Sequence, residues 1–289
     1  MRPLFCLAAL SLLAAPLAAA DPVTIKWSLK EGDTFYATTA QEVDQNIKVM
    51  GQAINQKMTT TTVAKFVVKS VKGDATTVEM TYTKVTIEGG PPGTAALTDR
   101  FKGAVLSAAL GKGYDITKLE GYDKFLDKLS DGDDMMRQIF TAVMPESAVK
   151  LLFTQVFVAA PGDKASDKWT RTDKVPLAGL GDLTNKTTYT VDGVKNDVAT
   201  IKTAGDVTFK AGAGNAALPF KIAKADLKSD EVKGSIQFDT KAGRLKSSTT
   251  TMKLKGTMTI EVQNQQIEAE IDQKATTTVE VSEKNPVKD

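Results

Sequence analysis

Residues 244–281 constrain the fold most, because their pattern is typical of only one kind of element. From position 252 to 262 the even-numbered residues are apolar or glycine, and the odd-numbered ones are Lys, Thr or Glu. After residues 263–266 the apolar side chains move to odd positions, from Ile267 to Val281. A period of two over this length indicates two half-buried strands. We predict an antiparallel hairpin in which Val262 lies opposite Ile267 and all apolar side chains share one face.

This register places one polar residue on the apolar face. Gln273 faces inward and lies opposite Gly256, so a polar group sits beside a missing side chain. A bulge or a local hydrogen bond explains this most simply, and a polar contact inside a ligand cavity is the alternative.

A two-stranded ribbon is not stable alone, so the rest of the chain must extend and cover it. Alternating residues predict a first strand at 23–29 and a second long hairpin over 35–68 that turns at Met50 and Gly51. Apolar parity also changes near Thr83 and Lys84, as a β-bulge requires. Residues 104–110 and 114–119 are interpreted as short strands, with helix as the alternative.

Two eight-residue segments resemble each other, and both lie on the return strand of a long hairpin. They are residues 54–61 (INQKMTTT) and 271–278 (IDQKATTT). They could mark a pseudo-symmetric pair of sheets that face one another. Alternatively, threonine-rich strands look alike by composition, because Thr is favoured on solvated strand faces.

The period changes between residues 120 and 160. Three sets of apolar residues follow helical spacing, beginning at Tyr122, Met135 and Val149, and Pro161 ends the last one. We therefore predict three short helices, each with an apolar stripe that needs a surface to cover.

The N-terminus has the pattern of a secretory signal. A basic start, a short apolar stretch and small residues ending at Ala20 predict cleavage near Ala20. Localisation would then be secreted or periplasmic, in a bacterial cell envelope. We expect residues 21–283 to form a single β-rich domain with a helical insertion at about 120–160, no transmembrane segment in the mature chain, and a frayed tail at 284–289.

Composition excludes several kinds of chemistry. The chain has no histidine, and its one cysteine, Cys6, lies in the signal, so the mature chain lacks the usual base, thiol nucleophile and thiolate ligand. A net charge of +2 gives no reason to expect nucleic acid as a partner. The acidic cluster at Asp131, Asp133 and Asp134 is interpreted as a helix start, with a surface calcium site as the alternative. We expect no catalytic residue, no metal and no cofactor.

Several short motifs resemble an uncharacterised family of secreted bacterial β-rich proteins, a domain of unknown function. They are residues 31–36 (EGDTFY), Gly51, residues 81–82 (TY), 119–121 (LEG), 168–170 (KWT) and 238–243 (FDTKAG). The architecture is also distantly similar to the half-barrels of periplasmic lipoprotein carriers, which hold acyl chains between a sheet and helices. The resemblance implies no catalytic residue.

We therefore predict a mainly β protein, with a curved antiparallel sheet or incomplete β-barrel and the helices of about 120–160 packed on its concave face. The leading function is a non-enzymatic binding protein for an apolar or amphiphilic, lipid-like ligand, which needs a void of about 300 Å³ or more. Candidate cavity residues are Phe66, Tyr82, Phe125, Phe153 and Gln273. The alternative is a structural or protein-interaction component of the cell envelope with a solid core and an envelope protein as partner.

Overall fold

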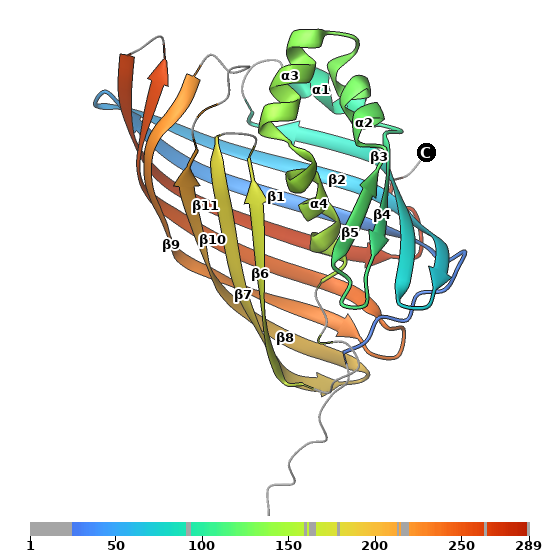
Figure 1. Ribbon diagram of the computed structural model, residues 1–289. Coiled ribbons are helices and arrows are strands. Elements are labelled where there is room, and N and C mark those ends of the chain that lie inside the picture. Colours follow the sequence, from blue (N-terminus) through green and yellow to red (C-terminus); the bar gives the residue numbers. More distant parts are fainter. Residues whose placement is uncertain are drawn as a thin grey trace, which may run out of the picture.

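A computed structural model describes residues 25–90, 94–158, 161, 166–177, 180–212, 214, 220–262 and 265–287. The predicted signal at 1–20 lies outside these residues. The structure confirms the predicted fold class, because one long antiparallel sheet curves around a group of short helices (Figure 1). The sheet is open, with β5 at one edge and β6 at the other.

Eleven strands and four helices make up the described part of the chain. The strands are β1 (Thr34–Val49), β2 (Gln52–Lys72), β3 (Ala75–Glu88), β4 (Val105–Leu110), β5 (Ile116–Glu120), β6 (Lys168–Pro176), β7 (Gly181–Lys195), β8 (Val198–Ala211), β9 (Phe220–Asp239), β10 (Arg244–Val262) and β11 (Gln265–Ser282). The helices are α1 (Thr94–Phe101), α2 (Tyr122–Ser130), α3 (Asp134–Val143) and α4 (Glu146–Val156). The strand order is β5-β4-β3-β2-β1-β11-β10-β9-β8-β7-β6, so the last long hairpin returns to pair with the first strand.

The predicted hairpins are present, but the register of the last one differs by two residues. Ile267 lies opposite Ile260, not Val262, and Val262 pairs with Gln265. Gln273 consequently faces Leu254, and Gly256 faces Ile271. A shift of two residues preserves the face of every side chain, so the predicted apolar side remains correct. The bulge predicted near Thr83 is confirmed by a register shift between β2 and β3.

The two similar segments lie in one sheet, which corrects the hypothesis of two sheets facing each other. They flank β1 on opposite sides in equivalent register, and Ile54 and Ile271 both pair with Ile47. Gln56 and Gln273 likewise both pair with Gln45. Because similar residues meet on three adjacent strands, the similarity makes continuous rows of like side chains across the sheet.

The three helices predicted at 120–160 are confirmed as α2, α3 and α4. Asp133 is the N-cap of α3, and its carboxylate accepts hydrogen bonds from the backbone N–H groups of Met135 and Met136 at 2.9 and 3.0 Å. This is the predicted helix start. The sequence interpretation missed α1, a helix of eight residues that packs against β3.

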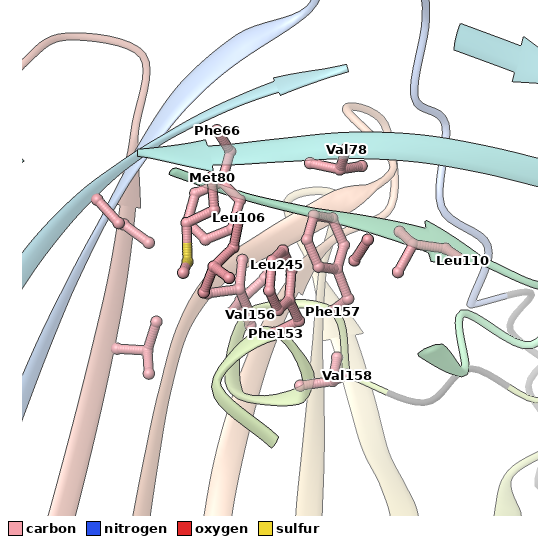
Figure 2. Close-up of a cluster of buried hydrophobic side chains, with 14 of the residues drawn as sticks. Phe66, Val78, Met80, Leu106, Leu110, Phe153, Val156, Phe157, Val158 and Leu245 are labelled. Carbon is pink, nitrogen blue, oxygen red and sulfur yellow. The ribbon is translucent and has the colours of Figure 1, made fainter. Parts of the chain in front are cut away.

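An aromatic core joins α4 to the concave face of the sheet. Phe66 stacks on Phe35 with ring centroids 5.3 Å apart, and Phe153 and Phe157 meet Phe66 edge-on at 6.2 and 5.7 Å. Figure 2 shows these phenylalanines of α4 and its C-terminal end beneath Phe66 and Met80. The interior between helix and sheet is therefore filled by side chains at this end.

The N-terminal segment belongs to the same core, but it is not the strand that its alternation predicted. Ile25 and Trp27 are buried, whereas residues 25–30 do not form a strand. The Trp27 indole donates to the Val158 carbonyl at 3.1 Å, and the Ser28 N–H donates to the Gly243 carbonyl at 2.8 Å. The segment therefore packs against the end of α4 and the turn between β9 and β10, and it does not pair along a strand edge. Alternation of apolar residues alone does not distinguish these two cases.

Candidate functional site

The concave face changes character along the strands. Beyond the aromatic core, side chains of eight strands form one row across the sheet, which we name the polar row. Adjacent members of this row are register partners on neighbouring strands. In the sheet order β2-β1-β11-β10-β9-β8-β7-β6 they are Thr60, Gln41, Thr277, Thr250, Gly234, Thr203, Tyr189 and Trp169. The ring of Tyr189 stacks on Trp169 at the β6 end, with centroids 5.1 Å apart.

Beyond the polar row, β1, β2 and β9–β11 continue away from the helices, toward the left in Figure 1. Their inner side chains are mainly apolar, and we name this surface the distal face. Its apolar members are Val43, Ile47, Val49, Ile54, Met58, Ile222, Leu227, Val232, Met252, Leu254, Met258, Ile260, Ile267, Ala269, Ile271 and Ala275, and the polar Gln45, Gln56, Ser229 and Gln273 lie among them. Ile54 is 55% exposed, and most of the others are half-buried. In these described strands the inner positions carry no charged residue.

The opposite, convex face of the same strands carries the charges. Lys57 pairs with Asp44 at 3.2 Å, and Lys48 pairs with Glu270 at 3.5 Å. Glu231 accepts from Lys233 and Lys253, and these hydrogen bonds lower its pKa to about 2. The sheet is therefore amphipathic beyond the helices, with a solvated outer side and an apolar inner side.

Two hollows flank α4 where the polar row meets the helix. The first, of about 140 Å³, is bordered by Phe66, Tyr82 and Leu152 on its apolar side. The second, of about 230 Å³, lies between α4 and strands β6–β11. Gln155 of α4 and Thr277 of β11 border both hollows. Neither hollow reaches the roughly 300 Å³ that the predicted ligand cavity needs, so the expected void is not found beside α4.

An ion pair lies in the wall of the second hollow, which we name the Arg171 hollow. The Arg171 Nε–H donates to Asp173 Oδ1 at 2.7 Å, and the two side chains are 18% and 24% exposed. No other ion pair among the described residues keeps both partners this far from solvent. Tyr189 borders the same hollow, where burial raises the pKa of its hydroxyl; Arg171 opposes this shift and Asp173 adds to it.

Most of the chain matches a model of a protein family. Residues 55–245, about two thirds of the sequence, match the family of unknown function named DUF6263. The chain belongs to the DUF6263 family. Among curated protein sequences, none matches the chain significantly. Within the described ranges, no helix combines the length and apolar composition needed to cross a bilayer.

Solved structures resemble this DUF6263 protein only weakly. Lipovitellin, from a structure of lipid–protein interactions, aligns with a TM-score of 0.47 and 9% identity over 91% of this chain and 26% of its own. The chain thus spans about a quarter of lipovitellin. DynF of Micromonospora chersina aligns with a TM-score of 0.22 and 9% identity, over 96% of this chain and 92% of DynF. The outer membrane protein OprG of Pseudomonas aeruginosa aligns with a TM-score of 0.25 and 8% identity, over 90% of this chain and 99% of OprG. All three TM-scores are below 0.5, so no functional inference rests on them.

The five candidate cavity residues occupy three different places. Phe66 and Tyr82 border the first hollow, and burial raises the pKa of the Tyr82 hydroxyl. Phe125 and Phe153 are almost completely buried, at 1% and 0% exposure, and belong to the packed core. Gln273 lies on the inner side of β11 and accepts a hydrogen bond from Gln45. The structure therefore brings Phe66 and Tyr82 together at a hollow and leaves Gln273 on the distal face.

Sequence reasoning missed Arg171, Asp173 and Gln155. Arg171 and Asp173 lie at the same odd positions of β6 as Trp169 and Val175, so all four side chains point to the concave side. Charged residues on a strand normally occupy the solvated face, and for this reason the pattern was not recognised as a site. The sequence signal is the shared parity, because Arg171 and Asp173 occupy the same odd positions as the apolar Trp169 and Val175.

Proposed function

We propose that this protein is a non-enzymatic binding protein for a lipid-like amphiphile, whose apolar chain lies along the distal face. The observation that carries the proposal is the uncharged, apolar inner side of five strands that no described helix covers at their far ends (Figure 1). A soluble protein rarely leaves such a surface open unless it binds something.

The size of the distal face suits an acyl chain. Six residues separate Val43 from Val49, which corresponds to about 20 Å along the strand, and five strands span about 19 Å across the sheet. One leaflet of a bilayer core is about 15 Å thick, so an acyl chain of that length fits along the strands. The corresponding area of the sheet is about 400 Å².

The chemistry of the surface favours a lipid over a protein partner. The face is concave and carries no charged residue, whereas protein interfaces have a polar rim with charged and hydrogen-bonding groups. A flexible hydrocarbon chain follows a concave sheet without leaving backbone groups unsatisfied. The absence of histidine and cysteine from the mature chain is consistent with binding instead of catalysis. The signal-like N-terminus supports a secreted or periplasmic location for this binding.

Binding can be tested by titrating the purified mature protein with a fluorescent acyl-chain probe and a long-chain monoacylglycerol as competitor. We expect saturable binding and displacement. Ile54→Lys places a charge on the distal face at an already exposed position, so we expect binding to weaken at least tenfold with little loss of stability.

Asn55→Lys is the matched control, because Asn55 is the next residue and points to the convex side. It should bind the probe as the wild type does. Saturable binding that is insensitive to Ile54→Lys, or no binding by the wild type, would refute the proposal. If a protein partner from the same cell envelope displaced the probe while lipids did not, the surface would be a protein interface instead.

A further inference from the structure

The Arg171 hollow differs chemically from the distal face that it adjoins. Arg171 and Asp173 are the only charged residues that border it in the described part of the chain, and Gln155, Asn185 and Tyr189 add polar groups. The guanidinium uses Nε for Asp173, and its Nη groups donate to no other described residue. Arg171 therefore keeps donors that can serve a molecule in the hollow that it borders.

A glycine lies between two residues that border the hollow. Gly234 lies in the polar row between Thr203 and Thr250. A Cβ at this position would lie 2.5 Å from the Thr249 carbonyl oxygen and 2.7 Å from Thr203 Oγ1. A larger residue would therefore push into the neighbouring strands, and Thr203 and Thr250 on either side of the glycine border the hollow.

The hollow is continuous with the distal face. Val232 borders the hollow and also belongs to the distal face, where it pairs with Met252. Arg171 lies in the same cross-sheet row, joined to Val232 through Thr187 and Gly205. A molecule with its chain on the distal face can thus reach the ion pair with its polar end.

We propose that the Arg171 hollow binds the polar head of the amphiphile, and that it selects a zwitterionic head that carries an anionic and a cationic group. This inference rests on the proposed function. The ion pair offers a positive and a negative group side by side, so it complements a head with the opposite arrangement. A head with a net negative charge is attracted by Arg171 but repelled by Asp173 at similar range.

The volume agrees with a head group and not with a whole lipid. A hollow of about 230 Å³ is several times the roughly 30 Å³ that one water occupies in the liquid. It accommodates several heavy atoms of a phosphate and an amine, while the chain requires the distal face.

Three lipids with the same acyl chain test the proposal by isothermal titration calorimetry of the full mature protein. They are lysophosphatidylethanolamine with a zwitterionic head, lysophosphatidylglycerol with an anionic head, and monoacylglycerol with an uncharged head. We expect the zwitterion to bind wild type at least tenfold more tightly than the other two. Asp173→Asn should strengthen binding of the anionic lipid and invert the preference, whereas Arg171→Gln should weaken both phosphate-bearing lipids.

Monoacylglycerol should bind every variant as it binds wild type. The double variant R171Q/D173N removes both charges without leaving one unpaired, so it should fold and bind all three lipids equally. Asp192→Asn breaks the exposed Lys202–Asp192 pair on neighbouring strands and should change nothing.

The outcomes separate the two proposals. If no lipid binds wild type, the proposed function fails and this inference fails with it. If monoacylglycerol binds but head charge makes no difference, or the uncharged head binds most tightly, only the head-group assignment is overturned. Loss of monoacylglycerol binding in the charge variants at unchanged stability would also overturn it, because the pair would then act on the chain.

Discussion

Gln45 and Gln273 face each other across β1 and β11, and the Gln45 Nε2–H donates to Gln273 Oε1 at 3.2 Å. Both side chains are half-buried within the apolar distal face. A polar group at such a position is tolerated when it has a partner. The pair therefore satisfies itself, which agrees with the local hydrogen bond considered from the sequence, although the partner is Gln45 and not a group near Gly256.

Replacing one glutamine should cost more than replacing both. Gln273→Leu leaves the Gln45 amide without its acceptor, and we expect the free energy of unfolding to fall by about 1 kcal/mol. The double variant Q45L/Q273L should return close to wild type, because two apolar side chains fit the surrounding surface. Urea unfolding of the four proteins in a double-mutant cycle measures this coupling. Equal losses that simply add would show that the hydrogen bond contributes nothing.

Parity along the strands was enough to predict the apolar face, because a side chain's face depends only on odd or even position. Register was harder to predict. The sequence between Val262 and Ile267 allows loops that differ by two residues, and both keep the same residues inside. The pairing of Gln273 with Gln45 also required knowing that β11 joins β1, a contact between positions 228 residues apart.

The helices at 122–157 were predictable because each has a complete apolar stripe, but α1 was not. Its large apolar residues are only Leu97 and Phe101, one turn apart, and they follow a glycine- and proline-rich stretch. Phe101 packs on Tyr82 and Phe125 with centroids 5.5 and 6.0 Å away. Tertiary contacts of this kind stabilise short helices, and periodicity over eight residues does not reveal them.

The candidate site was predictable in kind but not in place. Long strands with apolar residues at every second position predict an apolar concave face, yet the sequence suggested that the cavity lies under the helices. Phe153 and Phe157 fill that space, and the open apolar surface lies farther along the strands. Volume filling depends on the packing of side chains from distant segments, which a one-dimensional pattern does not contain.

Phe153 should act as a core residue instead of a ligand contact. It is completely buried against Phe66, and Phe153→Ala should lower the free energy of unfolding by about 3–5 kcal/mol. Met135→Ala, at a side chain that is 66% exposed, should stay within about 0.5 kcal/mol of wild type. Chemical denaturation measures both. A Phe153→Ala protein of wild-type stability that binds the acyl-chain probe differently would instead place Phe153 in the ligand site.

Gly256 on β10 should not tolerate a side chain. Its φ is 147°, and an added Cβ would lie 1.9 Å from the Asp226 carbonyl oxygen on β9. The two strands would have to move apart, so Gly256→Ala should cost about 1–3 kcal/mol in unfolding free energy. Gly113→Ala is the control, because its nearest neighbour would be an Asp115 carboxylate oxygen 3.7 Å away. Equal thermal midpoints for the two variants would contradict the close approach of β9 and β10.

The carboxylate of Glu231 should make the convex face sensitive to acid. Hydrogen bonds from Lys233 and then Lys253 lower its pKa from 4.5 to about 2. Because the folded pKa is depressed, its contribution to stability is complete above the unfolded value, declines as the pH falls below about 4.5, and is lost below about 2. Urea midpoints between pH 5 and pH 2 should therefore fall less steeply in Glu231→Gln than in wild type.

The effect of Glu231 should also weaken with salt, because its ion pairs lie on the solvated convex face and are screened. Glu88→Gln removes a carboxylate that has no ion-pair partner among the described residues, and it serves as the control. An identical pH dependence for Glu231→Gln and wild type at low ionic strength would mean that the two lysines do not hold this carboxylate in solution. These ion pairs of the convex face would then contribute nothing measurable to the stability of the sheet.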